Sequence, residues 1–263
     1  MIITMIMERS PSAPRHLDVT FLGTGDAFAS RGRFQSGYLL EGDGHRVLME
    51  AGPTVLCALK RANIDPASID LLLISHLHGD HFAGLPFLIL DYLWESHRRT
   101  TLTIAGPRHL EERTWRLFYT MFPRPSGAVE KIADKLKFVV LEPGCDVKFG
   151  KIRVSAIRTP HMKPDISLAL KLTLGGKTVA FSGDSGWTDD LIGFTNGADL
   201  FLCECTYFES TELDFHINYP KLVENRERFD VGRLILTHVG REVLDRNSEV
   251  DFEMADDGMK LRL

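Results

Sequence analysis

The chain has 263 residues, of which 44% are hydrophobic and 25% are charged. This length suits one large α/β domain or two small ones, and the composition is that of an ordinary globular protein rather than a membrane-embedded or disordered one. The net charge of −5 argues against a broad basic surface for nucleic acid. The apolar run at residues 1–7 is too short to cross a bilayer and lacks the basic residues of a secretory leader.

The four cysteines predict neither a disulfide framework nor a C-x-x-C pair. Cys203 and Cys205 lie in an apolar run, where small buried thiols are common. We therefore expect a reducing, cytoplasmic setting. No linker, repeat or low-complexity segment divides the chain, so we expect a flexible lead-in over residues 1–16 and a single domain over residues 17–263.

In chain order, the first half alternates predicted strands and helices. The strand at 18–22 is followed by a glycine-rich turn at 23–26, and the strands at 37–40 and 46–49 form a hairpin. A helix is expected at 54–62, a buried strand at 71–74, a helix at 82–96 and a strand at 101–105. Pro107 suits the first turn of the next helix, which should end near Met121.

The second half changes to short strand-like runs separated by glycine or proline turns. These runs cover residues 136–141, 146–149, 151–158, 166–174, 178–182, 200–203 and 234–236, with a helix at 221–229. Two strand-rich halves that each carry helices predict two sheets packed face to face, with helices outside.

The sequence I-S-H-L-H-G-D-H at residues 74–81 places four metal-capable side chains directly after the buried strand at 71–74. The four are His76, His78, Asp80 and His81. A lone histidine is more often structural, but this much polarity would be costly to bury without a partner. The end of a strand is where α/β folds usually place their chemistry. Imidazole and carboxylate together suit a divalent ion such as zinc.

Three further ligand-type residues follow other predicted strands. His161 comes after the strand at 151–158, Asp184 after the strand at 178–182, and His238 after the strand at 234–236. Any one of them alone is more often structural. Their common placement at strand ends predicts that they join the first four at one metal site.

These motifs resemble the metallo-β-lactamase superfamily, and within it the branch of ribonuclease Z and small phosphodiesterases. The family's H-x-H-x-D-H corresponds to residues 76–81, and its later histidine, aspartate and histidine correspond to His161, Asp184 and His238. The likeness runs from about Val19 to Arg241 and includes the Phe-Leu-Gly-Thr-Gly opening at 21–25.

The resemblance implies an αββα four-layer sandwich with two divalent metal ions at one edge of the sheets. Zn²⁺ is the expected metal, with Mn²⁺ or Fe²⁺ as alternatives. The first ion would be bound by His76, His78 and His161, the second by Asp80, His81 and His238, and both by Asp184. Two such ions can clamp a phosphoryl oxygen and activate a water at neutral pH.

The resemblance also implies catalytic roles for two side chains. Asp80 would orient or deprotonate the water, and His216 would protonate the leaving oxygen, as a non-ligand histidine does in ribonuclease Z-like enzymes. Alternatively, His216 is a surface residue without a catalytic role. If His216 is catalytic, Glu204 is a candidate to orient its ring. Glu50 stands where many relatives have an aspartate, so we expect it to support the metal site from behind.

The chain departs from ribonuclease Z proper in one informative place. That enzyme carries a long arm that grips transfer RNA, inserted between the positions of His161 and Asp184, where this chain has only two predicted strands. We therefore expect a phosphodiesterase for a small anionic phosphodiester or nucleotide, with neither extended nucleic-acid binding nor membrane binding. Arg31 and Arg33 are candidate phosphate contacts, and the branch allows a homodimer.

Other activities stay open. The same metal centre could hydrolyse the carbonyl of a lactone, thioester or β-lactam, or it could process transfer RNA despite the missing arm. A di-iron oxidoreductase is disfavoured, since such relatives replace the second histidine of the motif, here His78, with a carboxylate. A non-catalytic metal-binding protein is disfavoured because all seven ligand positions are filled.

Overall fold

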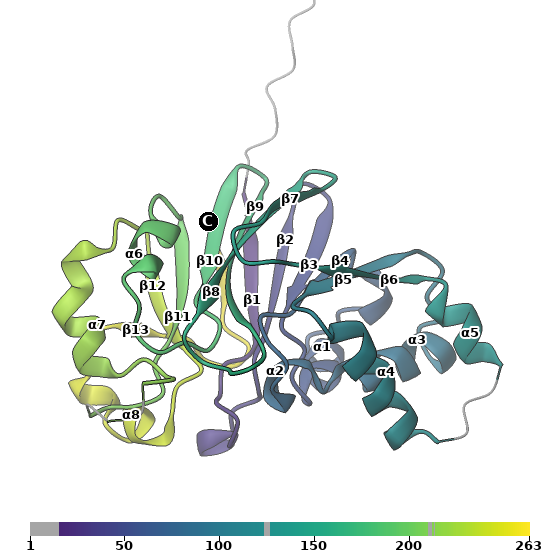
Figure 1. The fold of residues 1–263 in the computed structure, drawn as a ribbon, viewed down its shortest axis with the longest axis horizontal. Helices are drawn as coiled ribbons and strands as arrows, with labels where there is room; N and C mark the ends of the chain where they lie inside the picture. The colour runs from purple at the N-terminus through teal and green to yellow at the C-terminus, as the bar shows by residue number, and fades with distance from the viewer. Residues whose placement is uncertain (1–15, 124–126, 210–211, 213) are drawn as a thin grey trace, which may run out of the picture.

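Two seven-stranded β-sheets lie face to face at the centre of the molecule (Figure 1). The computed structural model describes residues 16–123, 127–209, 212 and 214–263, so residues 1–15 of the expected lead-in lie outside the described part. The first sheet contains, in spatial order, β14 (Lys260–Arg262), β1 (Asp18–Gly23), β2 (Gly37–Gly42), β3 (His45–Met49), β4 (Leu71–Leu73), β5 (Leu102–Gly106) and β6 (Leu136–Val140). The second contains β13 (Glu253–Met254), β12 (Leu234–Thr237), β11 (Leu200–Glu204), β10 (Lys177–Phe181), β9 (Ser167–Leu174), β8 (Ile152–Thr159) and β7 (Asp146–Phe149).

Helices lie on the outer side of each sheet (Figure 1). With the first sheet are α1 (Val55–Arg61), α2 (Gly79–Phe82), α3 (Leu85–Trp94), α4 (Leu110–Met121) and α5 (Ala128–Ala133), and with the second are α6 (Asp190–Thr195), α7 (Tyr219–Asn225) and α8 (Arg241–Asp245). Short 3₁₀ turns are η1 (Ser30–Gly32), η2 (Pro66–Ser68), η3 (Arg226–Arg228) and η4 (Asn247–Glu249). The four layers confirm the predicted αββα sandwich. Among the described residues, no helix is both long and apolar enough to span a bilayer.

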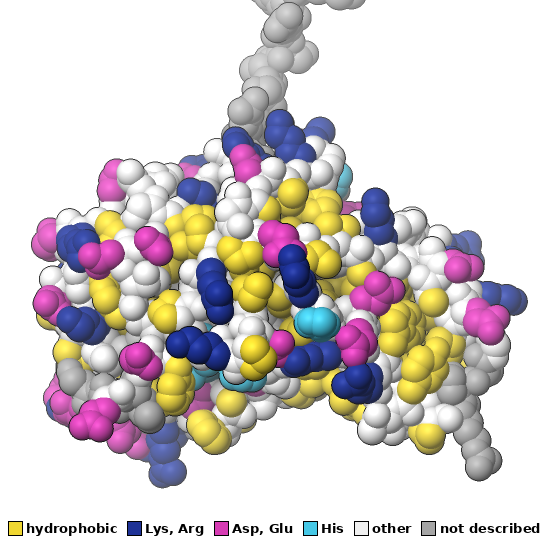
Figure 2. All heavy atoms as spheres, viewed as in Figure 1, with side chains coloured by type: hydrophobic (Ala, Val, Ile, Leu, Met, Phe, Trp, Pro, Cys, Tyr) yellow, Lys and Arg dark blue, Asp and Glu magenta, His cyan; other side chains and the backbone are white. Residues whose placement is uncertain are grey.

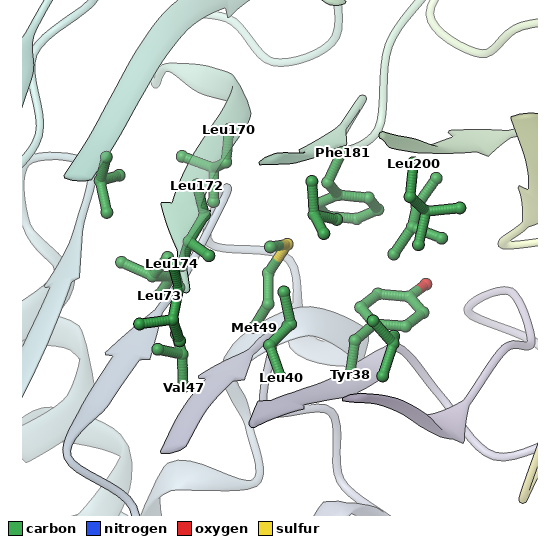
Figure 3. Close-up of a cluster of buried hydrophobic side chains, with 14 of the residues drawn as sticks. Tyr38, Leu40, Val47, Met49, Leu73, Leu170, Leu172, Leu174, Phe181 and Leu200 are labelled. Atoms are coloured by element: carbon green, nitrogen blue, oxygen red, sulfur yellow. The ribbon is translucent and has the colours of Figure 1, made fainter. Parts of the chain in front are cut away.

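The alternation of side chains along each strand builds three hydrophobic cores. Neighbouring residues of a strand point to opposite faces, so β3 places Val47 and Met49 between the sheets and Leu48 beneath the helices. Figure 3 shows side chains of β2, β3 and β4 meeting those of β9, β10 and β11 in the inter-sheet core. Each fully buried side chain of this size contributes about 1.5–3 kcal/mol. These cores hold the strand ends, and therefore the site, in a fixed arrangement.

The helices differ from the sequence prediction in their bounds. The helix predicted at 82–96 is α3, from Leu85 to Trp94, and a separate short helix, α2, ends at Phe82, with Ala83 and Gly84 between the two. A side chain at Gly84 would lie 2.3 Å from the Gly52 carbonyl oxygen, so this close contact requires glycine. The next helix begins at Leu110 rather than near Pro107, because His109 adopts a left-handed conformation with φ of 70°.

The helix predicted at 221–229 also has different bounds. It is α7, from Tyr219 to Asn225, followed by the separate turn η3. The Asn218 side chain accepts a hydrogen bond from the Lys221 backbone nitrogen and caps the helix start, and Pro220 lies in its first turn. The helix therefore begins earlier than its apolar residues indicate.

The C-terminal residues connect the two sheets. β13 pairs parallel with β12 in the second sheet, and β14 then pairs antiparallel with β1 in the first. Between them, Asp257 accepts hydrogen bonds from Thr24 and from the Phe34 backbone nitrogen. The loop after β1, at one edge of the sandwich, is therefore held by the end of the chain.

Candidate metal centre

The structure brings all seven predicted ligands together at one edge of the sandwich, where α2 lies in Figure 1. Residues 76–81 follow β4 of the first sheet, whereas His161, Asp184 and His238 follow β8, β10 and β12 of the second. The site is therefore shared between the sheets. The common placement at strand ends, seen in the sequence, corresponds to a common location in space.

A first group of ligand atoms comes from His76, His78, His161 and Asp184, and these atoms all lie within 4.8 Å of one another. Nε2 of His161 lies 3.0 Å from Nδ1 of His78. Nε2 of His76 and Nε2 of His161 lie 3.6 Å and 3.7 Å from Oδ2 of Asp184. Three imidazole nitrogens and one carboxylate oxygen thus converge on a small space.

A second group comes from Asp80, His81, Asp184 and His238, again within 4.8 Å. Oδ2 of Asp80 lies 3.2 Å from Nε2 of both His81 and His238. Asp184 belongs to both groups, with Oδ1 lying 3.2 Å from Nε2 of His81 and Oδ2 lying 3.5 Å from Nε2 of His238. Its carboxylate is placed to bridge two ions.

Several of these atoms are buried without hydrogen bonds. Among the described residues, Nε2 of His76, Nε2 of His81 and Oδ1 of Asp184 have no hydrogen-bond partner. Burying unpaired polar atoms is costly, and all three face the space between the ligand groups. A pair of divalent cations would satisfy them, and the mixture of imidazole and carboxylate suits Zn²⁺. The residues present therefore fit two such ions.

The histidines strongly affect the two carboxylates. Burial alone would raise the pKa of Asp184, but the imidazoles of His238 and His81 hold it well below its ordinary value. Burial likewise opposes ionisation of Asp80, yet its contacts with His81 and His238 lower its pKa. Both side chains are therefore anionic and available as ligands.

Glu50, flagged in the sequence as an unusual glutamate, lies directly behind His81. It is fully buried, and its Oε2 lies 2.8 Å from Nδ1 of His81 while its Oε1 accepts the Ser75 backbone N–H at 2.7 Å. A carboxylate at Nδ1 keeps the proton there and leaves Nε2 free for a metal. Burial raises the pKa of Glu50, and its bonds with His81 and Ser75 oppose the rise. The expected support from behind the site is thus a specific contact with one ligand.

The segment after Glu50 also positions the metal motif through its backbone. The Ala51 nitrogen donates to the His81 carbonyl oxygen at 2.7 Å. A side chain at Gly52 would lie 2.5 Å from the Asp80 carbonyl oxygen, so only glycine permits this approach. Strand β3 and helix α2 are thereby locked together.

His216 lies beside the ligands without belonging to either group of four. Its ring stacks on that of His238, with centroids 5.6 Å apart, and its Nδ1 lies 2.9 Å from Oε1 of the buried Glu204. Burial opposes the charged imidazole, but the Glu204 carboxylate outweighs this effect and raises the pKa of His216 to about 9. His216 is therefore not a surface histidine, and the Glu204 carboxylate favours its protonated form.

The backbone around His216 fixes its place. Thr206 donates its backbone N–H to the Ile217 carbonyl oxygen at 3.1 Å, and Tyr207 forms a bridge with Asn218. The carbonyl oxygen of Phe215, the residue before His216, lies 2.7 Å from Nδ1 of the ligand His161. This short segment therefore supports both a ligand and the non-ligand histidine.

The two predicted phosphate contacts are placed differently from each other. Arg33 donates through Nη1 to Thr24 Oγ1 at 2.7 Å and to the Ala255 carbonyl oxygen at 2.5 Å. These bonds hold the loop after β1 against the C-terminal segment, and the phosphate contact of Arg33 stays a prediction. Arg31 remains more than half exposed and pairs with Asp245 of α8.

Sequence reasoning missed the small polar residues that back the ligands. Ser75 Oγ lies 3.0 Å from Nδ1 of His76, and Thr206 Oγ1 lies 3.3 Å from Nδ1 of His238. Serine and threonine occur in many contexts, so nothing in their local pattern distinguishes these two. Only the proximity of Ser75 to the motif, one residue before His76, offered a signal.

Comparison with known proteins agrees with this geometry. A family model described as "Anti-Pycsar protein Apyc1" matches residues 17–255. The chain is 25% identical over 277 residues to the ribonuclease Z of Clostridium novyi (strain NT), with 85% of this chain and 89% of that protein covered. Ribonuclease Z is a hydrolase of the metallo-β-lactamase superfamily, so the chain has relatives that are enzymes of that superfamily.

Solved structures show the same fold. The metallo-β-lactamase fold protein YhfI from Bacillus subtilis gives a TM-score of 0.75 at 23% identity, covering 93% of this chain and 99% of that one. A diphosphatase from the PhnP family gives a TM-score of 0.73 at 15% identity, covering 93% of this chain and 97% of that one. The predicted metallo-β-lactamase fold and the likeness to ribonuclease Z are confirmed. Because the family model spans most of its length, the chain belongs to the family described as Anti-Pycsar protein Apyc1.

Proposed function

We propose that this protein is a two-metal phosphodiesterase that hydrolyses a small phosphodiester or nucleotide. The observation that carries the proposal is the position of His216: its Nδ1 lies 2.9 Å from Oε1 of Glu204 and its ring stacks on that of His238, outside both groups of four ligands. Hydrolysis of a phosphodiester must expel an alkoxide, which needs a proton. In hydrolysis of a carbonyl substrate, the largest contribution is usually stabilisation of the negative charge that develops on the carbonyl oxygen.

In this proposal the seven ligands hold two divalent ions, Zn²⁺ in the first instance. His76, His78 and His161 would hold the first, Asp80, His81 and His238 the second, and Asp184 would be shared between them. Two bound ions would polarise the phosphoryl oxygens and lower the pKa of a water. Asp80 would orient this water and accept its proton. As the water oxygen bonded to phosphorus, the ester P–O bond would break, and His216 would give its proton to the leaving oxygen.

Two observations support a small substrate. Between His161 and Asp184 the chain contains β9 and β10 joined by a two-residue turn, Gly175 and Gly176, so no arm extends from this position. Lys and Arg side chains are interspersed with Asp and Glu side chains on the face shown in Figure 2. A long polyanion is better matched by a continuous basic surface. Arg31, whose side chain is more than half exposed, is the more accessible of the two candidate contacts for a phosphate.

The test is an activity panel of the zinc-loaded protein with an aryl phosphodiester, cyclic nucleotides, a lactone and precursor transfer RNA. We expect turnover of the small diesters, and a loss of about 10²- to 10⁴-fold in His216→Ala with zinc content unchanged. His97→Ala, at an exposed histidine after α3, is the matched control and should keep full activity.

Other outcomes of the panel would replace the proposal. Turnover of the lactone that survives His216→Ala would assign the centre to carbonyl hydrolysis. Cleavage of precursor transfer RNA as fast as the best small diester would assign the chain to transfer-RNA processing.

A further inference from the structure

The buried carboxylate of Glu204 contacts more of the site than His216 alone. Its Oε1 accepts the Ser185 backbone N–H at 2.6 Å in addition to His216 Nδ1–H at 2.9 Å. Its Oε2 accepts the Thr206 hydroxyl at 2.9 Å. Ser185 directly follows the bridging Asp184. The fully buried Glu204 carboxylate thus contacts His216 directly and also contacts the residues beside Asp184 and His238.

The Thr206 hydroxyl lies between this carboxylate and a metal ligand. Its oxygen is 2.9 Å from Oε2 of Glu204 and 3.3 Å from Nδ1 of His238. A hydroxyl has one proton to donate and two lone pairs to accept with. The charged and nearer Glu204 takes the proton. Nδ1 of His216 also lies 3.3 Å from this oxygen, but its N–H donates to the nearer Oε1 of Glu204 at 2.9 Å, so the oxygen of Thr206 is left to accept from His238.

The ligand role of His238 requires this direction. Its Nε2 faces Asp80 and Asp184, at 3.2 Å and 3.5 Å, on the side where the ligand atoms converge. A neutral imidazole that presents a lone pair at Nε2 must carry its proton on Nδ1. Among the described residues, Thr206 Oγ1 is the side-chain acceptor that the structure places at this Nδ1.

We propose that Thr206 is a positioning residue that connects Glu204 to His238, so that one carboxylate orients both His216 and a metal ligand. The part that concerns His216 as an acid rests on the proposed function, whereas the link to His238 concerns metal binding alone. Acceptors behind metal-bound histidines fix the tautomer and make the ligand more basic.

In the second group of ligands, the histidines are then backed by negatively charged carboxylates. His81 is backed directly by Glu50 at 2.8 Å, and His238 is backed by Glu204 through a hydroxyl. In the first group, the acceptors are neutral: the Ser75 hydroxyl behind His76 and a backbone carbonyl behind His161. Loss of the Thr206 hydroxyl should therefore act on the second group alone.

The test compares Thr206→Val, which replaces the hydroxyl with a methyl of similar size, with Thr206→Ser, which keeps it. Metal-free full-length protein is titrated with Zn²⁺ by calorimetry. We expect Thr206→Val to weaken binding of one of the two zinc equivalents about 10- to 100-fold. The other equivalent should be unchanged, and Thr206→Ser should restore both. Equal zinc affinities in wild type and a folded Thr206→Val would overturn the proposal.

A second measurement keeps the test decisive if the valine variant binds zinc poorly for general structural reasons. Long-range ¹H–¹⁵N NMR spectra report which imidazole nitrogen carries the proton. In zinc-free Thr206→Val, the Nδ1–H form of His238 should decrease, whereas that of His161, held by a backbone carbonyl, should not. An unchanged His238 tautomer, or equal changes in both histidines, would refute the link. Neither measurement uses a phosphodiester, so the link between Thr206 and His238 can be tested even if the proposed phosphodiesterase activity is wrong.

Discussion

Replacing Glu50 with glutamine should weaken zinc binding although the side chain keeps its size. Both carboxylate oxygens of Glu50 accept in the native protein, from the Ser75 backbone N–H at 2.7 Å and from His81 at 2.8 Å. An amide offers one acceptor and one donor group. If its oxygen faces Ser75, its NH₂ group faces Nδ1 of His81, and the imidazole must then carry its proton on Nε2, the nitrogen that faces the metal.

The magnitude follows from this conflict. Either His81 binds in its unfavourable tautomer or one buried donor is left unpaired, and an unsatisfied buried group costs about 1–3 kcal/mol. At about 1.4 kcal/mol per tenfold change, this corresponds to a loss of about 5- to 150-fold in zinc affinity. Glu50→Asp should also bind more weakly, because the shorter side chain cannot reach both donors.

The assay is zinc titration of metal-free protein, with circular dichroism to confirm folding. The matched control is Glu41→Gln, at a partly exposed glutamate of β2 that pairs with Arg46, and it should bind zinc as the native protein does. Native zinc affinity in a folded Glu50→Gln variant would show that the contact with His81 does not set the tautomer, and the reasoning would be refuted.

Three further predictions concern acid chemistry, metal and packing. Glu204 raises the pKa of His216 to about 9, so activity should fall as the pH rises through about 9. This fall should be absent from the pH–rate profile of His216→Asn. The same pKa shift stabilises the fold fully below pH 6.5, and this contribution is lost as the pH rises from 6.5 to about 9. Melting temperatures of the native protein and His216→Asn, measured across this pH range, check it. Chelation should lower the melting temperature, and zinc at about 1,000 times its dissociation constant should restore about 4 kcal/mol. Tyr38→Phe should cost about 1–2 kcal/mol in urea unfolding, since it leaves the buried Thr237 hydroxyl without its 2.7 Å partner, whereas the exposed Tyr119→Phe should be neutral.

Local patterns in the sequence carry much of the fold and most of the ligand set. Residues 76–81 lie one after another beyond a buried strand, and His161, Asp184 and His238 each follow a strand of their own, so their placement depends on strand ends that hydrophobic runs reveal. The cytoplasmic setting, the homodimer and the assignment of each ligand to an ion stay predictions.

The features that the sequence did not predict depend on contacts between distant segments. The break between α2 and α3 arises where Gly84 meets Gly52, and the late start of α4 depends on the backbone of one histidine, His109. The bonds from Arg33 to Thr24 and to the Ala255 carbonyl oxygen are likewise not visible in the local sequence. Thr206 has no local signature, since its role exists only where β11 and β12 end side by side.

The pairing of β1 with β14 has a consequence for the order in which the protein is built. Asp18 and Arg262, 244 positions apart, are bonded across this pair, so β1 is synthesised long before the strand that covers its outer edge. Until then β1 presents an open edge, which invites mispairing. His238 also emerges late, after every other ligand. The second group of ligands is therefore completed only after β12 has been made, whereas the first group needs no residue beyond Asp184.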